Sequence, residues 1–198
     1  MTSNNIELYA RQFESKNKLI GQTVRQVIFY LEASDKDFTE QPNQFGKSLL
    51  NGIDIKTDDL TFSIGNRYSN LGYGLSIDPG QTNELEYFEE LKESIKFDTP
   101  IVGQTLRQVN IYWMNIPFED EKGLYPQEIE LITDDGYLLA SSIEINNGEV
   151  NTEFTNELLI IDNIEVANQL KLGQFGLVDN ERQIFRDLVE LTESEQKN

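Results

Sequence analysis

Apolar and polar positions along the chain follow one pattern twice. Residues 19–31 read LIGQTVRQVIFYL and residues 101–113 read IVGQTLRQVNIYW, with Gly, Gln, Thr, Arg, Gln, Val and Tyr at identical places. Each copy puts a glycine before a β-branched and aromatic run, which indicates a turn or bulge with positive φ that leads into a strand. The repetition predicts an internal duplication of one structural unit.

Alternating apolar and polar residues predict two further strands after each copy of the motif. The alternation covers residues 53–64 in the first half and residues 129–139 in the second, and each stretch contains Thr-Asp-Asp. Asp135-Gly136 favours a tight hairpin in the second half, whereas Leu60 follows Asp59 in the first, so we expect the two turns to differ. Shorter strands are expected at 73–77, 142–145 and 158–161.

Helical spacing marks three segments. The first is residues 1–18, where Ile6, Tyr9 and Phe13 would share one face, although a strand fits this stretch nearly as well. The others are residues 83–95, which end the first half, and residues 180–192, with Asp179 as the expected N-cap. Residues 33–52 are polar and rich in turn residues, which predicts a long loop, and residues 164–177 are ambiguous.

These patterns together predict an α+β fold. We expect two tandem repeats of an antiparallel sheet unit, residues 1–99 and 100–198, each ending in a helix and packed as one pseudo-twofold body. The repeated Arg25 and Arg107 are expected to lie over a carboxylate of a neighbouring strand.

Composition narrows the possible chemistry. The chain has no cysteine and no histidine, which excludes thiolate metal sites and every Ser-His-Asp or Cys-His arrangement. Motifs for nucleotide binding are missing, and we expect no cofactor, no bound metal and no catalytic residues. Because no run approaches the roughly 20 apolar residues of a membrane span and no signal peptide is evident, the expected location is the cytoplasm.

Charge indicates the kind of partner. The net charge of −19 makes nucleic acid and anionic membranes poor partners and favours a basic protein, although an acidic surface also serves solubility alone. The first half carries a net charge of −6 and the second −13, so the acidic surplus is concentrated in the second. If Trp113 is exposed, it is a candidate contact residue for the partner; the alternative is that its side chain is buried between the two units. The candidate partner-binding residues are Glu119, Asp120, Glu121, Glu128, Glu130, Asp134, Asp135, Glu144 and Trp113.

The leading interpretation is a non-catalytic acidic protein that occupies a basic partner such as a toxin or nuclease, in the manner of a bacterial immunity protein or antitoxin. The alternative is a carboxylate-based hydrolase, with or without a metal ion, centred on Asp134 and Asp135, with Asp58 and Asp59 as its pseudo-symmetric counterpart. A scaffold without a single partner is a third reading.

Overall fold

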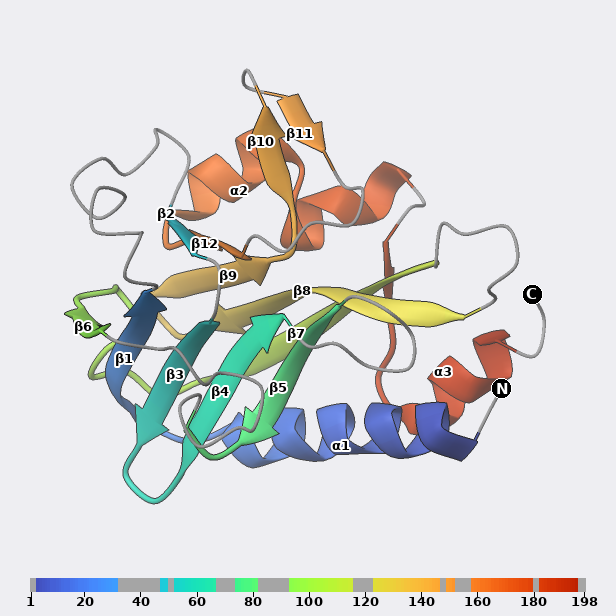
Figure 1. Ribbon diagram of the computed structural model, residues 1–198, viewed down its shortest axis with the longest axis horizontal. Helices are drawn as coiled ribbons and strands as arrows, with labels where there is room; N and C mark the ends of the chain where they lie inside the picture. The colour runs from blue at the N-terminus through green and yellow to red at the C-terminus, as the bar shows by residue number, and fades with distance from the viewer. Residues whose placement is uncertain are drawn as a thin grey trace.

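The computed structural model describes nine stretches of the chain: residues 3–31, 47–49, 52–66, 74–81, 93–115, 123–146, 149–151, 158–179 and 182–195. These residues form an α+β fold with two large antiparallel sheets, one small hairpin and three α-helices (Figure 1). The small hairpin pairs β10 (Glu144–Asn146) with β11 (Glu149–Asn151).

The first sheet has five strands in the order β5-β4-β3-β1-β6. Its central strand, β3, alternates buried isoleucines with polar residues, as the sequence pattern predicts. The strands are β1 (Val24–Leu31), β3 (Gly52–Thr57), β4 (Thr61–Asn66), β5 (Leu75–Pro79) and β6 (Glu93–Phe97).

The second sheet has six strands in the order β13-β7-β8-β9-β12-β2. The short strand β2 comes from the first half of the chain but pairs with β12 of the second, so the halves share this sheet. The strands are β2 (Lys47–Leu49), β7 (Gln108–Asn115), β8 (Leu124–Ile132), β9 (Tyr137–Ser141), β12 (Leu158–Ile161) and β13 (Gln183–Ile184).

One hydrophobic core joins the sheets, with side chains such as Phe62 and Ile129 fully buried. Helix α1 (Ser3–Leu19) contacts both β5 and β7 and adds aromatic rings to this core. Tyr9 meets Trp113 edge-on at 5.2 Å between ring centroids, and Phe13 stacks on the same indole at 6.0 Å. The helix therefore completes the core along one side of the sheets.

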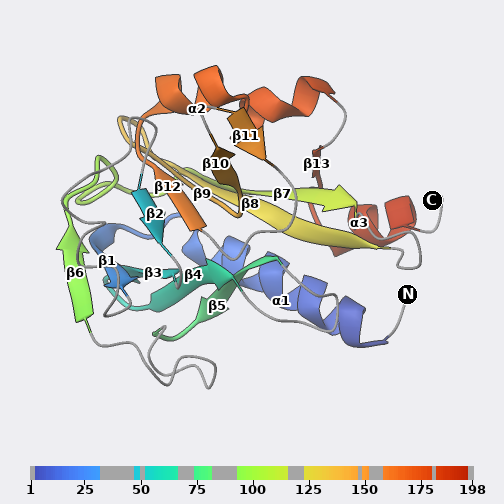
Figure 2. The same ribbon diagram turned by 45° about the horizontal axis from the view of Figure 1, so that its top comes forward.

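A second, smaller core lies on the other face of the six-stranded sheet. Helix α2 (Ile164–Leu170) and the 3-10 helix η3 (Gly173–Asp179) cover this face, away from α1 (Figure 2). Ala167 and Leu170 of α2 join Leu139 and Ile161 of the sheet in one buried cluster. Strand β8 is consequently buried on both faces.

The two Gly-Gln-Thr segments lie side by side and bond to each other. Gly21 N–H donates to the Leu106 carbonyl at 2.8 Å, and Gly103 N–H donates to the Val24 carbonyl at 2.8 Å. Two more backbone bonds and a bridge between Thr23 and Thr105 complete the contact. We call residues 21–24 and 103–106 the seam; both glycines have the expected positive φ, +87° and +83°.

Two predicted helices are placed differently by the structure. Only residues 93–95 of the predicted helix 83–95 are described, and they belong to β6, because Ile95 pairs with Phe29 of β1. The predicted helix 180–192 is wrong at its start: Gln183 and Ile184 pair with β7, and α3 (Leu188–Glu195) begins only after Asp187. The side chain of Asp187 accepts the Glu190 N–H at 3.0 Å and so caps the helix.

The remaining differences concern loops and turns. The predicted loop 33–52 contains strand β2, while its residues 33–46 lie outside the described stretches. The two Thr-Asp-Asp turns make the same bonds instead of different ones, because Thr57 Oγ1 bonds the backbone of Leu60 just as Thr133 Oγ1 bonds the backbone of Gly136. The ambiguous stretch 164–177 holds α2 and most of η3.

Gly103→Ala tests the seam. An alanine would hold a φ of +83° that L-residues adopt only with strain, so we expect the free energy of unfolding to fall by about 1–2 kcal/mol in urea denaturation. Gly21→Ala should cost a similar amount, whereas Ile164→Ala, at an exposed position on α2, should change the urea midpoint little. An unchanged midpoint in Gly103→Ala would contradict this role.

Candidate functional site

The structure divides the predicted partner-binding residues into three groups. Asp134 and Asp135 are exposed side by side in the turn between β8 and β9. Glu128, Glu130 and Trp113 are fully buried and cannot touch a docked partner, which corrects their assignment as partner-binding residues; for Trp113 the burial given as the alternative is what the structure shows. Residues 119–121 lie outside the described stretches, as does the side chain of Glu144.

Glu128 and Glu130 are two residues apart on β8, so both point to the same face of the sheet. That face lies under η3, and the two carboxylates form a buried polar cluster between the sheet and this helix. Burying a carboxylate without hydrogen-bond or ionic partners costs much free energy, so each oxygen of the two glutamates needs a partner inside the protein.

Glu130 is bound by neighbouring side chains of β7. Its Oε2 accepts a hydrogen bond from the Tyr112 hydroxyl at 2.6 Å and from Asn110 Nδ2 at 2.8 Å. Its Oε1 accepts the backbone N–H of Gln174, in the first turn of η3, at 3.5 Å. Glu130 thus links the middle of the sheet to the start of η3.

Glu128 is bound by a different set of partners. Its Oε1 accepts from Ser141 Oγ at 3.0 Å, and its Oε2 accepts the Gly173 N–H at 2.8 Å. Arg182 Nε lies 3.0 Å from Oε2 in a buried ion pair, at an angle that makes no hydrogen bond. The pair therefore fixes the chain just before β13 to the centre of the six-stranded sheet.

Gly173 is required for this arrangement. Its φ is +58°, and a Cβ at this position would lie 2.8 Å from Glu130 Oε1 and 3.2 Å from the Tyr137 hydroxyl. The close approach brings two successive N–H groups onto the two glutamates. The cluster is thus an anion-binding contact within the protein, of the kind that helix N-termini make with carboxylates.

The surroundings shift the acidity of several groups in the cluster. Burial raises the pKa of Glu128, while the nearby Arg182 guanidinium and the Gly173 N–H act in the opposite sense. Burial and then the Glu130 charge raise the pKa of Tyr112 far above its ordinary value, so this hydroxyl remains a hydrogen-bond donor. Outside the cluster, burial raises the pKa of Tyr125, a residue of β8 in the main core, to about 12.

One exposed aspartate in each of the two Thr-Asp-Asp turns is bound by an arginine. Arg107 contacts both oxygens of Asp134 at 2.7–3.1 Å, and Arg25 contacts both oxygens of Asp58. Hydrogen bonding to these guanidinium groups lowers the pKa of each aspartate. The expectation that each arginine lies over a carboxylate is confirmed, and the geometry adds no support for a hydrolase centred on Asp134 and Asp135.

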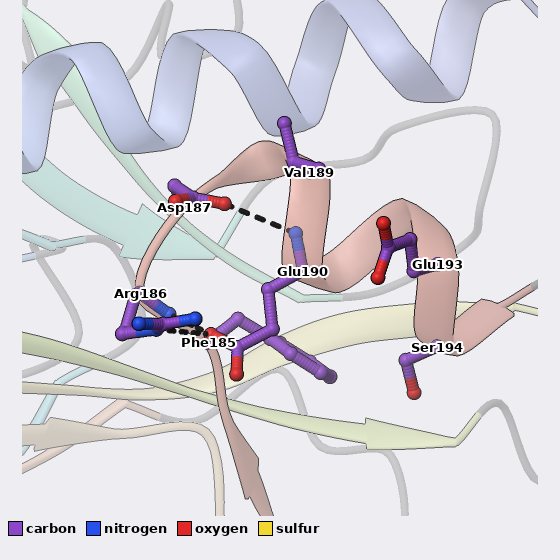
Figure 3. A pocket seen from close by; sticks show the side chains of 7 residues that line it. All are labelled: Phe185, Arg186, Asp187, Val189, Glu190, Glu193 and Ser194. Atoms are coloured by element: carbon purple, nitrogen blue, oxygen red, sulfur yellow. Dashed lines mark hydrogen bonds and ion pairs between the residues drawn. The ribbon is translucent and has the colours of Figure 1, made fainter.

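A shallow surface hollow of about 510 Å³ lies beside α3 (Figure 3). Its walls mix apolar, acidic and basic side chains from the end of β13 to the last turn of α3. Sequence reasoning missed this feature because it placed these residues inside one continuous helix. The lining residues are Phe185, Arg186, Asp187, Val189, Glu190, Glu193 and Ser194.

The described residues contain neither a metal cluster nor a membrane-spanning helix. There, no three acidic side chains gather closely enough to hold a metal ion. None of the described helices has both the length and the apolar character needed to cross a bilayer. Comparison with protein-family models, with characterised proteins and with solved structures finds no match to this chain.

Arg182→Met tests the buried ion pair. Removing the guanidinium leaves Glu128 without its counter-charge, so we expect the free energy of unfolding to fall by about 3–5 kcal/mol at neutral pH. Adding Glu128→Gln should restore part of this loss, since the double variant buries no unpaired charge. As a control, Arg186→Met removes an arginine that is 85% exposed and should change stability little. Equal effects of Arg182→Met and Arg186→Met would contradict the assignment.

The pH dependence of stability tests the ionisation of Glu128. A carboxyl whose pKa is raised on folding contributes stability below its ordinary value of 4.5, and this contribution is lost as the pH rises through the higher folded pKa. The free energy of unfolding, measured in urea at successive pH values, should therefore fall for the wild type relative to Glu128→Gln as the pH rises above 4.5. The comparison of wild type with Asp134→Asn should show the opposite trend. Because the pKa of Asp134 is lowered on folding, its contribution to the free energy of unfolding is lost as the pH falls, so the wild type should lose stability relative to Asp134→Asn at low pH. Parallel curves for wild type and Glu128→Gln would count against the raised pKa.

Proposed function

We propose that this chain is a non-catalytic binding protein whose acidic surface occupies a basic protein partner. The observation that carries the proposal is the state of the exposed charges in the described part of the chain. Exposed arginines and lysines there are in ion pairs with carboxylates, apart from Lys171. By contrast, several exposed carboxylates in those stretches have no ion pair: Glu7, Asp59, Asp98, Asp135, Glu165 and Glu193.

Unpaired surface carboxylates leave a field that acts on approaching molecules. Such a field repels nucleic acid and anionic lipid and accelerates association with a basic protein. Glu128 and Glu130, in contrast, are held inside the fold and are not available for this role. Within the second half, Asp134 and Asp135 are the members of the predicted set whose described side chains are exposed, and Arg107 already neutralises Asp134.

The proposal includes an origin by duplication, with the halves related by a pseudo-twofold axis through the seam. Contacts that recur at the sequence offsets of the repeat support it. Tyr30 donates to Asp54 Oδ2 at 2.6 Å in one sheet, and Tyr112 donates to Glu130 Oε2 at 2.6 Å in the other. The Arg25–Asp58 and Arg107–Asp134 pairs follow the same offsets, 82 residues for the arginines and 76 for the aspartates. On this view residues 1–99 and 100–198 are the two units.

The most concrete form of the function is a bacterial inhibitor of a toxin or nuclease, comparable to an immunity protein or antitoxin and working in the cytoplasm. Enzymes that cut nucleic acids expose basic surfaces to the phosphate backbone. An acidic protein can block such a surface without any chemistry of its own. Sequence asymmetry supports a dominant role for the second half, which carries a net charge of −13 against −6.

Salt-dependent capture tests the function. The immobilised chain should retain a basic protein from a cell lysate at about 50 mM NaCl and release it by about 500 mM, because salt screens the attraction. A resin carrying polyglutamate serves as the charge control, and the captured protein, once purified, should bind the chain at a fixed stoichiometry. The proposal fails if no basic protein is retained, if salt does not matter, or if polyglutamate retains the same protein equally well.

A further inference from the structure

The outer face of α3 combines an exposed apolar side chain with acidic neighbours. The helix packs Leu191, fully buried, and Leu188, partly buried, against the main core. Helical periodicity therefore turns the intervening Val189 outward. Val189 is 63% exposed, more than any other large apolar side chain in the described stretches. This burial pattern leaves an apolar contact point on the surface instead of in the core.

Val189 is one of the residues that line the hollow beside α3 (Figure 3). The hollow has room for a side chain of another molecule. The ring of Phe185 also lines the hollow, although most of its surface is buried in the core. The hollow thus presents apolar atoms, and its walls are otherwise polar. An apolar point within a polar rim is the usual composition of a protein contact site.

The charges around the hollow are unequal. Among the described residues that line the hollow, Arg186 is the one cation, and it is bound by Glu190, whose Oε2 accepts hydrogen bonds from the Arg186 backbone N–H at 2.8 Å and from Arg186 Nε at 3.2 Å. Asp187 is occupied by the Glu190 N–H as the cap of α3. Glu193 has no ion pair and faces outward one turn after Val189. The hollow therefore offers an unneutralised carboxylate next to an apolar surface.

We propose that this hollow docks a basic amphipathic segment of a partner protein, with an apolar side chain against Val189 and a lysine or arginine on Glu193. This inference rests on the proposed function and names the surface that carries it. A second copy of the chain is a poor occupant, since each copy has a net charge of −19. The charges on the hollow instead complement an apolar residue flanked by cations.

A labelled 14-residue peptide of leucine and lysine at helical spacing is the probe, with a leucine–glutamate peptide as its counterpart. Fluorescence anisotropy at low salt should show binding of the lysine peptide alone. Val189→Gln should weaken this binding about tenfold through lost apolar contact, and Glu193→Gln about threefold. The controls on α2, Ile164→Gln and Glu165→Gln, also change one apolar and one acidic side chain that are exposed, Ile164 at 44% against 63% for Val189, and should stay within about twofold.

Several results would overturn this assignment. Equal weakening of peptide binding by the α2 and α3 variants would mean that the peptide binds through the overall charge of the chain and not at α3. Binding of the leucine–glutamate peptide would exclude charge complementarity as the basis of docking. A wild-type dimer that Val189→Gln converts to a monomer would make a second copy the occupant. If Val189→Gln still captures the basic partner at wild-type affinity, the location is wrong but the proposed function stands. If the lysine peptide binds at α3 while wild-type chain retains no basic protein from lysate, the surface stands and the proposed function fails.

Discussion

The reciprocal hydrogen bonding of the seam is the constraint on which the arrangement of the sheets depends. Residues 21–24 lead directly into β1, and residues 103–106 lead towards β7, so the contact fixes where both strands begin. With those starts fixed, the inward side chains of both sheets meet in one core, and α1 covers its open side with Tyr9 and Phe13 on Trp113. Gly21 and Gly103 adopt the positive φ of the two segments without the strain that a side chain would add.

The second constraint is the burial of carboxylates in a strongly acidic chain. Glu128 and Glu130 occupy a central strand whose two faces are both covered, where water cannot solvate them. The protein satisfies them with Tyr112, Ser141 and Arg182, and with the N–H groups of η3. The same contacts attach η3 and the segment before β13 to the sheet, so β13 and α3 are positioned by a polar cluster as well as by the apolar core.

Local patterns predicted the strands that carry a clear alternation or a β-branched run, such as β1, β7 and β12, and the arginine–aspartate pairs at the turns. They failed where tertiary pairing decides the conformation. Ile95 continues a helical spacing of apolar residues in the sequence but pairs with Phe29 of β1, and Ile184 joins the edge of a sheet before α3 begins. Glu128 and Glu130 were predicted to bind a partner because they belong to the acidic surplus of the second half, and nothing local in the sequence indicates that η3 covers them.

The distinction between internal and external carboxylates bears on how an acidic protein acquires a function. A buried carboxylate such as Glu130 needs hydrogen-bond donors around it, so the fold can hold only a few of them. A surface carboxylate without an ion pair needs no such donors and adds to the electrostatic field outside the protein. Charge alone gives long-range attraction without a defined orientation, and a defined orientation needs a short-range apolar contact. The proposed docking surface on α3 would combine the two, because Val189 and Glu193 are one turn apart on a helix that Leu191 fixes to the core.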